Sequence, residues 1–314
     1  MVGCVIVVNS QIIGEGYTST YGGPHAEVNA IRSVKDLNLL KKATLYVTLE
    51  PCSHHGKTPP CSDLILKYKI PKVVIGCIDP HKKVSGKGIE RLRAHGCEVL
   101  VGTEEALCRK HHKRFLTYHT KKRPYIILKW AETKNGFVAP FEKNEKRPFW
   151  ISGKLSRQLV HQWRAEEQAV LVGANTVIQD NPRLTTRHVN GKNPTRVVLT
   201  KSDNLSKKYA IFNKDAETIT INIKSLKPNS PLVNQICNEL YNKKITSLIV
   251  EGGPKTIQLF IDENLWDEAR IFKASQAMKD GIKAPKLLTN NETAMVLGND
   301  QLYFSFNEFD SKQS

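Results

Sequence analysis

Two stretches of sequence decide the fold of the first half of this chain: PHAEVNAI at residues 24–31 and TLEPCSHHGKTPPC at residues 48–61. The first predicts the start of an amphipathic helix, and the second follows an apolar strand. One His and two Cys form a ligand set that suits Zn²⁺ and leaves a fourth position for water. The candidate ligands are His25, Cys52 and Cys61. Glu27 follows His25 by two residues and is a candidate carrier of protons at that position.

The order His-x-Glu, Pro-Cys, Cys matches the established H-x-E…P-C-x-x-C signature of zinc deaminases that act on nucleobases. One difference is the spacing, because eight residues, SHHGKTPP, separate Cys52 from Cys61. This longer segment brings His54, His55 and Lys57 to the mouth of the predicted site. A lone cysteine is usually a small core residue. We therefore interpret the remaining cysteines as core or surface thiols: Cys4, Cys77, Cys97, Cys108 and Cys237.

Length and composition narrow the class of protein. A chain of 314 residues predicts two domains of roughly 150 residues each. Lys and Arg number 47 against 30 Asp and Glu, and the formal charge of +17 favours a polyanionic or phosphorylated partner. Seven cysteines are a poor disulfide framework and indicate a reducing compartment. Since no apolar run is long enough for a bilayer and no signal peptide is recognisable, we expect a cytoplasmic protein without a membrane partner.

Apolar runs alternate with helical stretches in both halves, which favours layered α/β domains. In the first half we predict strands at 4–8, 12–17, 44–49, 72–78 and 97–101, with helices at 25–36, 62–69 and 86–95. In the second half we predict strands at 125–131, 169–174, 195–200, 218–223, 247–253 and 268–274, with helices at 153–166, 231–242 and 255–263. Residues 109–123 carry seven Lys or Arg and no acid, and predict a charged helix end and a solvated connector. We place the domains at residues 1–120 and 121–314.

The second half has no G-x-G-x-x-G after its first strand, so a Rossmann dinucleotide site is not supported. It has instead Glu251-Gly252-Gly253-Pro254 between a strand and a helix, a turn whose backbone amides can hold a phosphate.

With the zinc motif, the sequence resembles the bifunctional deaminase/reductase family of riboflavin biosynthesis. The deaminase half is matched by PHAEVNAI and TLEPCSHHGKTPPC. The reductase half is matched, in order, by LKWAETKNG (128–136), WIS (150–152), VGANTVIQDNPRLTTR (172–187), PTRVVL (194–199) and IVEGG (249–253). The resemblance implies a cytidine-deaminase-like α/β/α layered domain followed by a dihydrofolate-reductase-like α/β domain that uses NADPH.

The resemblance also implies roles for individual residues. His25, Cys52 and Cys61 would bind zinc, Glu27 would be the proton donor, and His54 and Lys57 would contact the phosphorylated substrate. The dinucleotide would contact Ala131, Trp150, Thr176, Asp180 and Gly253. The substrate of the reductase half would contact Arg164, Leu184, Arg187 and Glu251, and arginines suit a phosphate because their forked donors bind it in a bidentate way. Lys129, on the first strand of this domain, is our candidate to polarise or protonate the sugar oxygen.

We therefore expect deamination of 2,5-diamino-6-ribosylamino-4(3H)-pyrimidinone 5′-phosphate and then NADPH-dependent reduction of the ribosyl group to a ribityl chain. We also expect a homo-oligomer that binds small phosphorylated pyrimidines and no nucleic acid. One alternative is a tRNA-type base deaminase with an accessory domain, which the charge favours and the cysteine spacing disfavours. Another is a degenerate scaffold protein without activity.

The start of the chain differs from the family pattern. The family usually begins with a helix and an Asn-Pro-x-Val-Gly segment, of which Met1-Val2-Gly3 corresponds to the end. We expect either a misassigned start or a deaminase half with weakened substrate binding and an exposed apolar patch.

Overall fold

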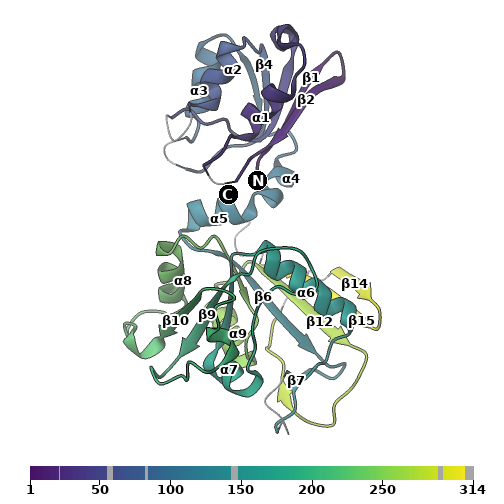
Figure 1. Ribbon diagram of the computed structural model, residues 1–314, viewed down its shortest axis with the longest axis vertical. Coiled ribbons are helices and arrows are strands. Elements are labelled where there is room, and N and C mark those ends of the chain that lie inside the picture. Colours follow the sequence, from purple (N-terminus) through teal and green to yellow (C-terminus); the bar gives the residue numbers. More distant parts are fainter. Residues whose placement is uncertain (21, 55–58, 82–83, 143–147, 289–292, 308–314) are drawn as a thin grey trace. The chain divides into compact units, whose positions relative to one another are not determined.

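The computed structural model describes residues 1–20, 22–54, 59–81, 84–142, 148–288 and 293–307. The chain divides into two compact units, Met1–Lys121 and Lys122–Ser314 (Figure 1). Each unit has a sheet and an apolar core of its own. Within the described residues, no helix is both long and apolar enough to cross a membrane.

The first unit is built on a five-stranded sheet with the order β2-β1-β3-β4-β5. Its strands are β1 (Gly3–Val8), β2 (Gln11–Tyr17), β3 (Thr44–Leu49), β4 (Lys72–Cys77) and β5 (Glu98–Val101). Strand β1 is antiparallel to both neighbours, and β3, β4 and β5 run parallel. The predicted helices form as α1 (Ala26–Ser33), α2 (Cys61–Lys67) and α3 (Lys87–Ala94), and a 3₁₀ helix η1 (Leu37–Lys42) follows α1.

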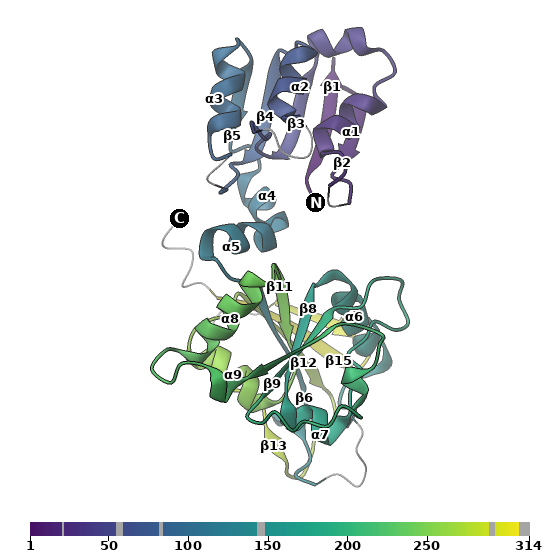
Figure 2. The ribbon, with the colours of Figure 1, turned by 60° about the vertical axis from the view of Figure 1, so that its left-hand side comes forward.

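Alternation along the strands separates the two faces of this sheet. Ile6, Leu45 and Val73 pair across β1, β3 and β4 and are fully buried in a cluster with residues of α1, α2 and α3. All three helices therefore cover the same face, as Figure 2 shows. On the other face, Tyr46 and Leu100 lie in one cross-strand row and stay partly exposed.

The segment 109–123 differs from the prediction of a solvated connector. It forms two helices, α4 (Glu105–His111) and α5 (Lys113–Lys121). Helix α4 packs on β4, where the Sγ of Cys108 lies so close to Gly76 that a Cβ there would be 2.2 Å away. His112 is buried, and its Nε2 is 2.9 Å from the Oγ1 of Thr48. The many Lys and Arg residues of this segment indicated its exposed side. They gave no indication that its other side packs on the sheet.

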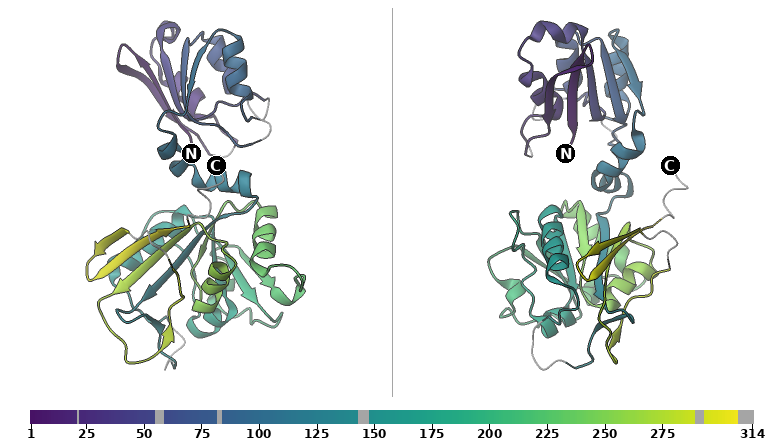
Figure 3. Two further views of the ribbon diagram at one scale, coloured as in Figure 1. Left: turned by 180° about the vertical axis from the view of Figure 1, so that it is seen from behind. Right: turned by 90° about the vertical axis from the view of Figure 1, so that its right-hand side faces the viewer.

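The second unit is built on an eight-stranded sheet with the order β10-β9-β8-β11-β6-β12-β15-β14. The strands are β6 (Tyr125–Glu132), β8 (Ala169–Gly173), β9 (Thr195–Thr200), β10 (Thr218–Asn222), β11 (Ser247–Val250), β12 (Glu268–Ala274), β14 (Thr293–Leu297) and β15 (Asp300–Phe306). The sheet is parallel from β10 to β12, and the last two strands are antiparallel at its edge, drawn in yellow in Figure 3. The short strands β7 (Phe137–Ala139) and β13 (Ile282–Lys283) pair separately.

Helices cover both faces of this sheet (Figure 2). The helices of the unit are α6 (Lys154–Glu166), α7 (Ala174–Asp180), α8 (Leu232–Asn242) and α9 (Pro254–Asp262), with 3₁₀ turns η2 (Ala210–Phe212) and η3 (Ile223–Ser225). Ile126 and Leu128 of β6 pack with α8 and α9. Tyr125 and Ile127, which alternate with them, pack with α6 and α7. Strand β6 is thus buried on both sides, as expected for a central parallel strand.

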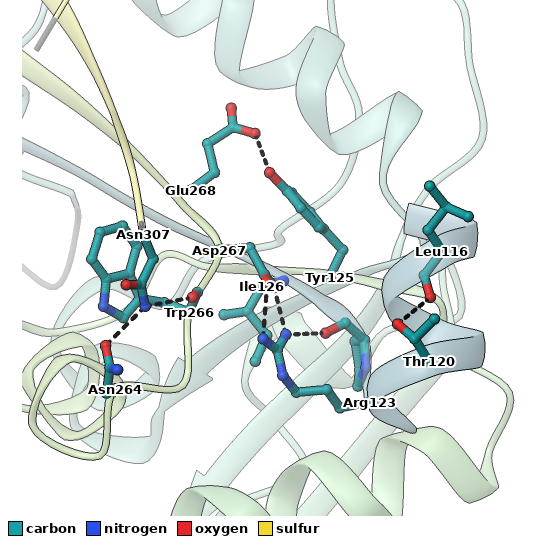
Figure 4. Close-up of polar contacts among 11 residues, drawn as sticks. Leu116, Thr120, Arg123, Tyr125, Ile126, Asn264, Trp266, Asp267, Glu268 and Asn307 are labelled. Atoms are coloured by element: carbon teal, nitrogen blue, oxygen red, sulfur yellow. Dashed lines mark hydrogen bonds and ion pairs between the residues drawn. The ribbon is translucent and has the colours of Figure 1, made fainter. Parts of the chain in front are cut away.

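A buried ion pair joins the start of β6 to the start of β12 (Figure 4). The guanidinium of Arg123 donates to Asp267 through Nη1 at 2.5 Å and Nη2 at 2.8 Å. The same carboxylate accepts the backbone N–H of Ile126 at 2.7 Å. The two charged side chains are only 9% and 6% exposed, so each needs the other as a counter-charge.

Replacing Asp267 by Ala should lower the free energy of unfolding of this unit by about 3–5 kcal/mol, because it removes the buried carboxylate that accepts from both Arg123 and the Ile126 N–H. Replacing both residues, as Arg123→Met with Asp267→Leu, should recover part of that loss, since the Ile126 N–H still loses its acceptor. Urea denaturation of the three proteins measures the difference. A loss below about 1 kcal/mol for Asp267→Ala would contradict the inferred role of the pair.

Candidate active sites

The predicted zinc ligands of the first unit come together. His25 directly precedes α1, Cys61 is the first residue of α2, and Cys52 lies just after β3. The Nδ1 of His25 is 3.5 Å from the Sγ of Cys52 and 3.3 Å from the Sγ of Cys61. All three donor atoms lie within 4.8 Å of one another.

This arrangement fits a zinc ion. With Zn–S bonds of about 2.3 Å and Zn–N bonds of about 2.0–2.1 Å, tetrahedral ligand atoms lie roughly 3.5 Å apart, close to the observed separations. Hydrogen bonds from Cys61 and His25 lower the pKa of Cys52 to about 4 against the opposing effect of burial. Cys52 is therefore ready to act as a thiolate, the form that binds metals.

Glu27 lies in the first turn of α1, beside this cluster, and only 3% of its surface is exposed. Burial raises its pKa to about 7. A carboxyl group with a pKa near neutrality can both take up and release a proton at working pH.

Glu50 is a buried acid at this site that the sequence analysis did not single out. Its carboxylate accepts backbone N–H groups of Asp79 and Gly86 through Oε2 and of Gly88 and Ile89 through Oε1, at 3.0–3.4 Å. It thereby joins the residue before Pro51-Cys52 to the start of α3. A Cβ at Gly88 would lie 2.1 Å from the carbonyl oxygen of Pro51, so only glycine fits. The sequence offered one indication that Glu50 belongs to this site, because Glu50 directly precedes Pro51-Cys52 at the end of a predicted strand.

Of the two residues predicted to bind substrate in this unit, the structure describes one. His54 is exposed two residues after Cys52. Lys57, with His55, lies outside the described residues.

In the second unit, every predicted residue lines one cavity of about 650 Å³, a size typical of ligand pockets. These residues are Lys129, Ala131, Trp150, Arg164, Thr176, Asp180, Leu184, Arg187, Glu251 and Gly253. They come from β6, the segment before α6, α6 itself, α7, the loop after α7, and the turn between β11 and α9.

Three charged groups converge in this cavity. Arg164 donates to both oxygens of Glu251, through Nε and Nη2, each at 2.7 Å. The Nζ of Lys129 lies 3.9 Å from the Oε2 of Glu251. Burial alone would raise the pKa of Glu251, but the charges of Arg164 and Lys129 and the hydrogen bonds lower it to about 2. Burial lowers the pKa of Lys129, and Glu251 opposes that shift.

The glycine turn of this unit needs glycine for steric reasons. A Cβ at Gly252 would lie 2.4 Å from the Cβ of Val172. Any residue other than glycine would therefore force the turn away from β8. Gly253 has a φ of +61° and precedes α9, and a Cβ on it would meet the Oγ1 of Thr176 at 3.3 Å. The turn therefore presents open backbone to the cavity beside α7, as a bound phosphate requires.

The cavity also contains residues that the sequence analysis missed. The guanidinium of Arg157 stacks over Trp150, 4.8 Å from the ring centroid. His161 and Arg183 complete the polar lining. The spacing of Arg157, His161 and Arg164 along α6, at i, i+4 and i+7, is one face of a helix and was a usable signal.

Comparisons with known proteins agree with the class of protein predicted for each half of the chain. Residues 1–77 match the family model for the zinc-binding region of cytidine and deoxycytidylate deaminases, and residues 124–279 match the RibD C-terminal domain. The riboflavin biosynthesis protein RibD of Aquifex aeolicus is 40% identical over 297 residues, which covers 90% of this chain and 82% of that one. This chain belongs to the RibD family. Its fold class is thus the predicted one.

Solved structures support the assignment. A diaminohydroxyphosphoribosylaminopyrimidine deaminase/5-amino-6-(5-phosphoribosylamino)uracil reductase from Thermotoga maritima has a TM-score of 0.85 at 38% identity, covering 96% of this chain and 90% of that one. RibD of Acinetobacter baumannii has a TM-score of 0.84 at 30% identity, covering 97% and 91%. These matches favour the riboflavin enzyme over a nucleic-acid deaminase.

As a member of the RibD family, the chain is an enzyme with a zinc-dependent deaminase domain and a reductase domain that uses NADPH. His25, Cys52 and Cys61 are the residues that would hold the zinc ion, which would lower the pKa of a water ligand to about 7. The dinucleotide would supply a hydride, and the cavity beside Gly253 and Thr176 has open backbone and a hydroxyl group that would suit it.

Cys52→Ser should release most of the zinc from the protein during dialysis against a chelator, because hydroxyl oxygen is a poor zinc ligand at neutral pH. Cys97→Ser is the matched control, since Cys97 is buried elsewhere in the same unit and donates to the carbonyl of Ile70. Metal analysis should find about one zinc per chain in wild type and in the control. Equal zinc content in all three proteins would contradict the ligand assignment.

Glu251 should make the stability of the second unit depend on pH. Its pKa falls from 4.5 to about 2 on folding, so its stabilisation is present above pH 4.5 and is lost as the pH falls towards 2. Glu251→Gln should therefore be less stable than wild type by roughly 3 kcal/mol at pH 7 and equal to it near pH 2. Denaturation at several pH values measures this, with the exposed Glu166→Gln as control. A difference independent of pH would contradict it.

Proposed function

We propose that the chain catalyses two consecutive steps of riboflavin synthesis on a phosphorylated ribosylaminopyrimidine. The first is hydrolytic deamination of 2,5-diamino-6-ribosylamino-4(3H)-pyrimidinone 5′-phosphate. The second is NADPH-dependent reduction of 5-amino-6-(5-phosphoribosylamino)uracil to the ribityl product. One observation carries the proposal. A single chain of the RibD family has a buried Glu27 beside a His-Cys-Cys cluster, and a partly buried Lys129 in a cavity rich in arginine.

In the first step, water adds to C2 of the pyrimidine, ammonia leaves, and a carbonyl replaces the amino group. Glu27 takes a proton from the attacking water and delivers it to the leaving nitrogen. His54 and Lys57 hold the phosphorylated end of the substrate. Glu50 keeps Cys52 in place through its bonds to the start of α3.

In the second step, the bond between C1′ and the ring oxygen breaks, the nitrogen on C1′ keeps its hydrogen and forms a protonated imine, and C1′ then receives a hydride to give the amine. Lys129 protonates the ring oxygen as the ring opens, and Glu251 orients its ammonium group. Arg164 and Arg187 bind the phosphate, and Leu184 packs on the substrate. The dinucleotide lies along Ala131, Trp150, Thr176, Asp180 and Gly253, which align it with the sugar and exclude water.

The proposal extends to the setting of the enzyme. We propose a cytoplasmic homo-oligomer that binds small molecules and no nucleic acid. The seven free cysteines favour a reducing compartment. Size-exclusion chromatography with light scattering measures the oligomeric state.

Two variants separate the two activities. Glu27→Gln should abolish ammonia release from the diaminopyrimidine ribotide, because the proton carrier is lost, while NADPH oxidation with the aminouracil ribotide stays at the wild-type rate. Lys129→Met should do the reverse, lowering single-turnover hydride transfer by about 10²-fold or more. Ammonia and NADPH absorbance are followed with each substrate. Ammonia release from tRNA and not from the ribotide would overturn the proposal.

A further inference from the structure

His161 is a buried histidine in the reductase cavity to which the proposed mechanism gives no role. It lies on α6, three residues before Arg164 and on the same side of that helix. Only 6% of its surface is exposed, yet it contributes to the cavity wall. A histidine placed between two proposed phosphate-binding arginines, Arg164 and Arg187, is positioned to affect both.

The contacts of His161 are to the loop that carries Arg187. Its Nδ1 lies 3.2 Å from the backbone nitrogen of Arg187 and 3.1 Å from the carbonyl oxygen of Thr185. Arg164 reaches the same Thr185 carbonyl through Nη1 at 3.4 Å. The guanidinium of Arg187 donates to the Oγ1 of Thr185 at 3.1 Å. Helix α6 therefore holds the segment from Thr185 to Arg187 by two side chains.

That loop needs such support, because its backbone is strained at both ends. Leu184 has a φ of +51° and His188 a φ of +66°. Both are left-handed values, which residues with a Cβ adopt at a cost in free energy. Thr186 is held from the other side by Asn193 and Lys192. The bond from His161 therefore acts on the next residue, Arg187, whose direction decides whether its guanidinium faces the cavity.

The protonation state of His161 follows from its neighbours. Burial, together with the charges of Arg164 and Arg187, lowers its pKa to about 4, so the ring is neutral at working pH. The backbone N–H of Arg187 can only donate, so its bond to Nδ1 requires the tautomer with hydrogen on Nε2. The Thr185 carbonyl is then left to Arg164. The ring thus fixes the Arg187 backbone without adding a third positive charge to the site.

We propose that His161 is the positioning residue that holds the loop 184–188 so that Arg187 faces the cavity beside Arg164, and that it thereby sets the preference of the reductase for phosphorylated over dephosphorylated substrate. This rests on the proposed reductase function. In this proposal His161 acts through its bond to the Arg187 backbone, and Arg187 is the residue that contacts the phosphate.

The test compares kcat/KM for the aminouracil ribotide and for its dephosphorylated form in wild type and four variants. His161→Leu removes the acceptor and should reduce the ratio of the two kcat/KM values about tenfold, through a higher KM for the ribotide, with kcat and the KM for NADPH unchanged. His161→Asn places a carbonyl oxygen near the position of Nδ1 and should restore the ratio. His161→Gln places it near Nε2 and should not. Gln162→Ala, on the exposed side of α6, is the control.

Several results would overturn the proposal: an unchanged ratio in His161→Leu, an equal loss for both substrates, or the same ratio in the Asn and Gln variants. If His161→Leu does not fold, the comparison of His161→Asn with His161→Gln still tests the proposal. Both variants are polar and differ mainly in the position of the carbonyl oxygen. Calorimetric binding of ribose 5-phosphate gives a second measurement without turnover, and it should weaken in the Leu and Gln variants only. Wild type that oxidises no NADPH with either pyrimidine would refute the proposed function instead.

Discussion

Parallel strands impose the constraint on which both active sites depend. Consecutive parallel strands need a crossover helix, so their carboxyl ends all meet at one edge of the sheet. Cys52 follows β3 in the first unit, and the Glu251-Gly253 turn follows β11 in the second. Each functional loop is thereby brought next to the start of a helix: α2 in one case and α9 in the other.

Each of the two sites contains an enclosed glutamate, and the pKa values of these two glutamates are shifted in opposite directions. Glu27 is buried next to sulfur and imidazole ligands, and its pKa rises to about 7. Glu251 is buried next to Lys129 and Arg164, and its pKa falls to about 2. The same side-chain type therefore has a pKa near neutrality in one unit and a pKa well below its usual value in the other. The difference lies in the charge of the neighbours, since both carboxylates are almost fully enclosed.

Most central strands and long helices could be predicted from apolar periodicity, because they are buried on one or both faces and the pattern records burial. The misses have physical reasons. The sequence pattern predicts no strand after residue 274, whereas β14 and β15 complete the sheet at its edge, where half-exposed strands lose a clear alternation. Helix α7 buries only Val177 among its seven residues, so its sequence carries no periodic apolar signal. The packing of His112 against Thr48 joins residues 64 apart and leaves no local trace.

The sequence by itself determined which chemical groups are available: the types and order of the candidate zinc ligands, and the carboxyl group two residues from the first of them. These depend on side-chain identity and short spacing, which a linear chain displays directly. Only the tertiary structure decided that Arg164 and Glu251, 87 residues apart, form a two-fold hydrogen-bonded pair next to Lys129. It also decided that His161 supports the loop of Arg187. Such contacts arise where separate strands and helices converge, and their geometry is set by the packing of the sheet and not by any local pattern.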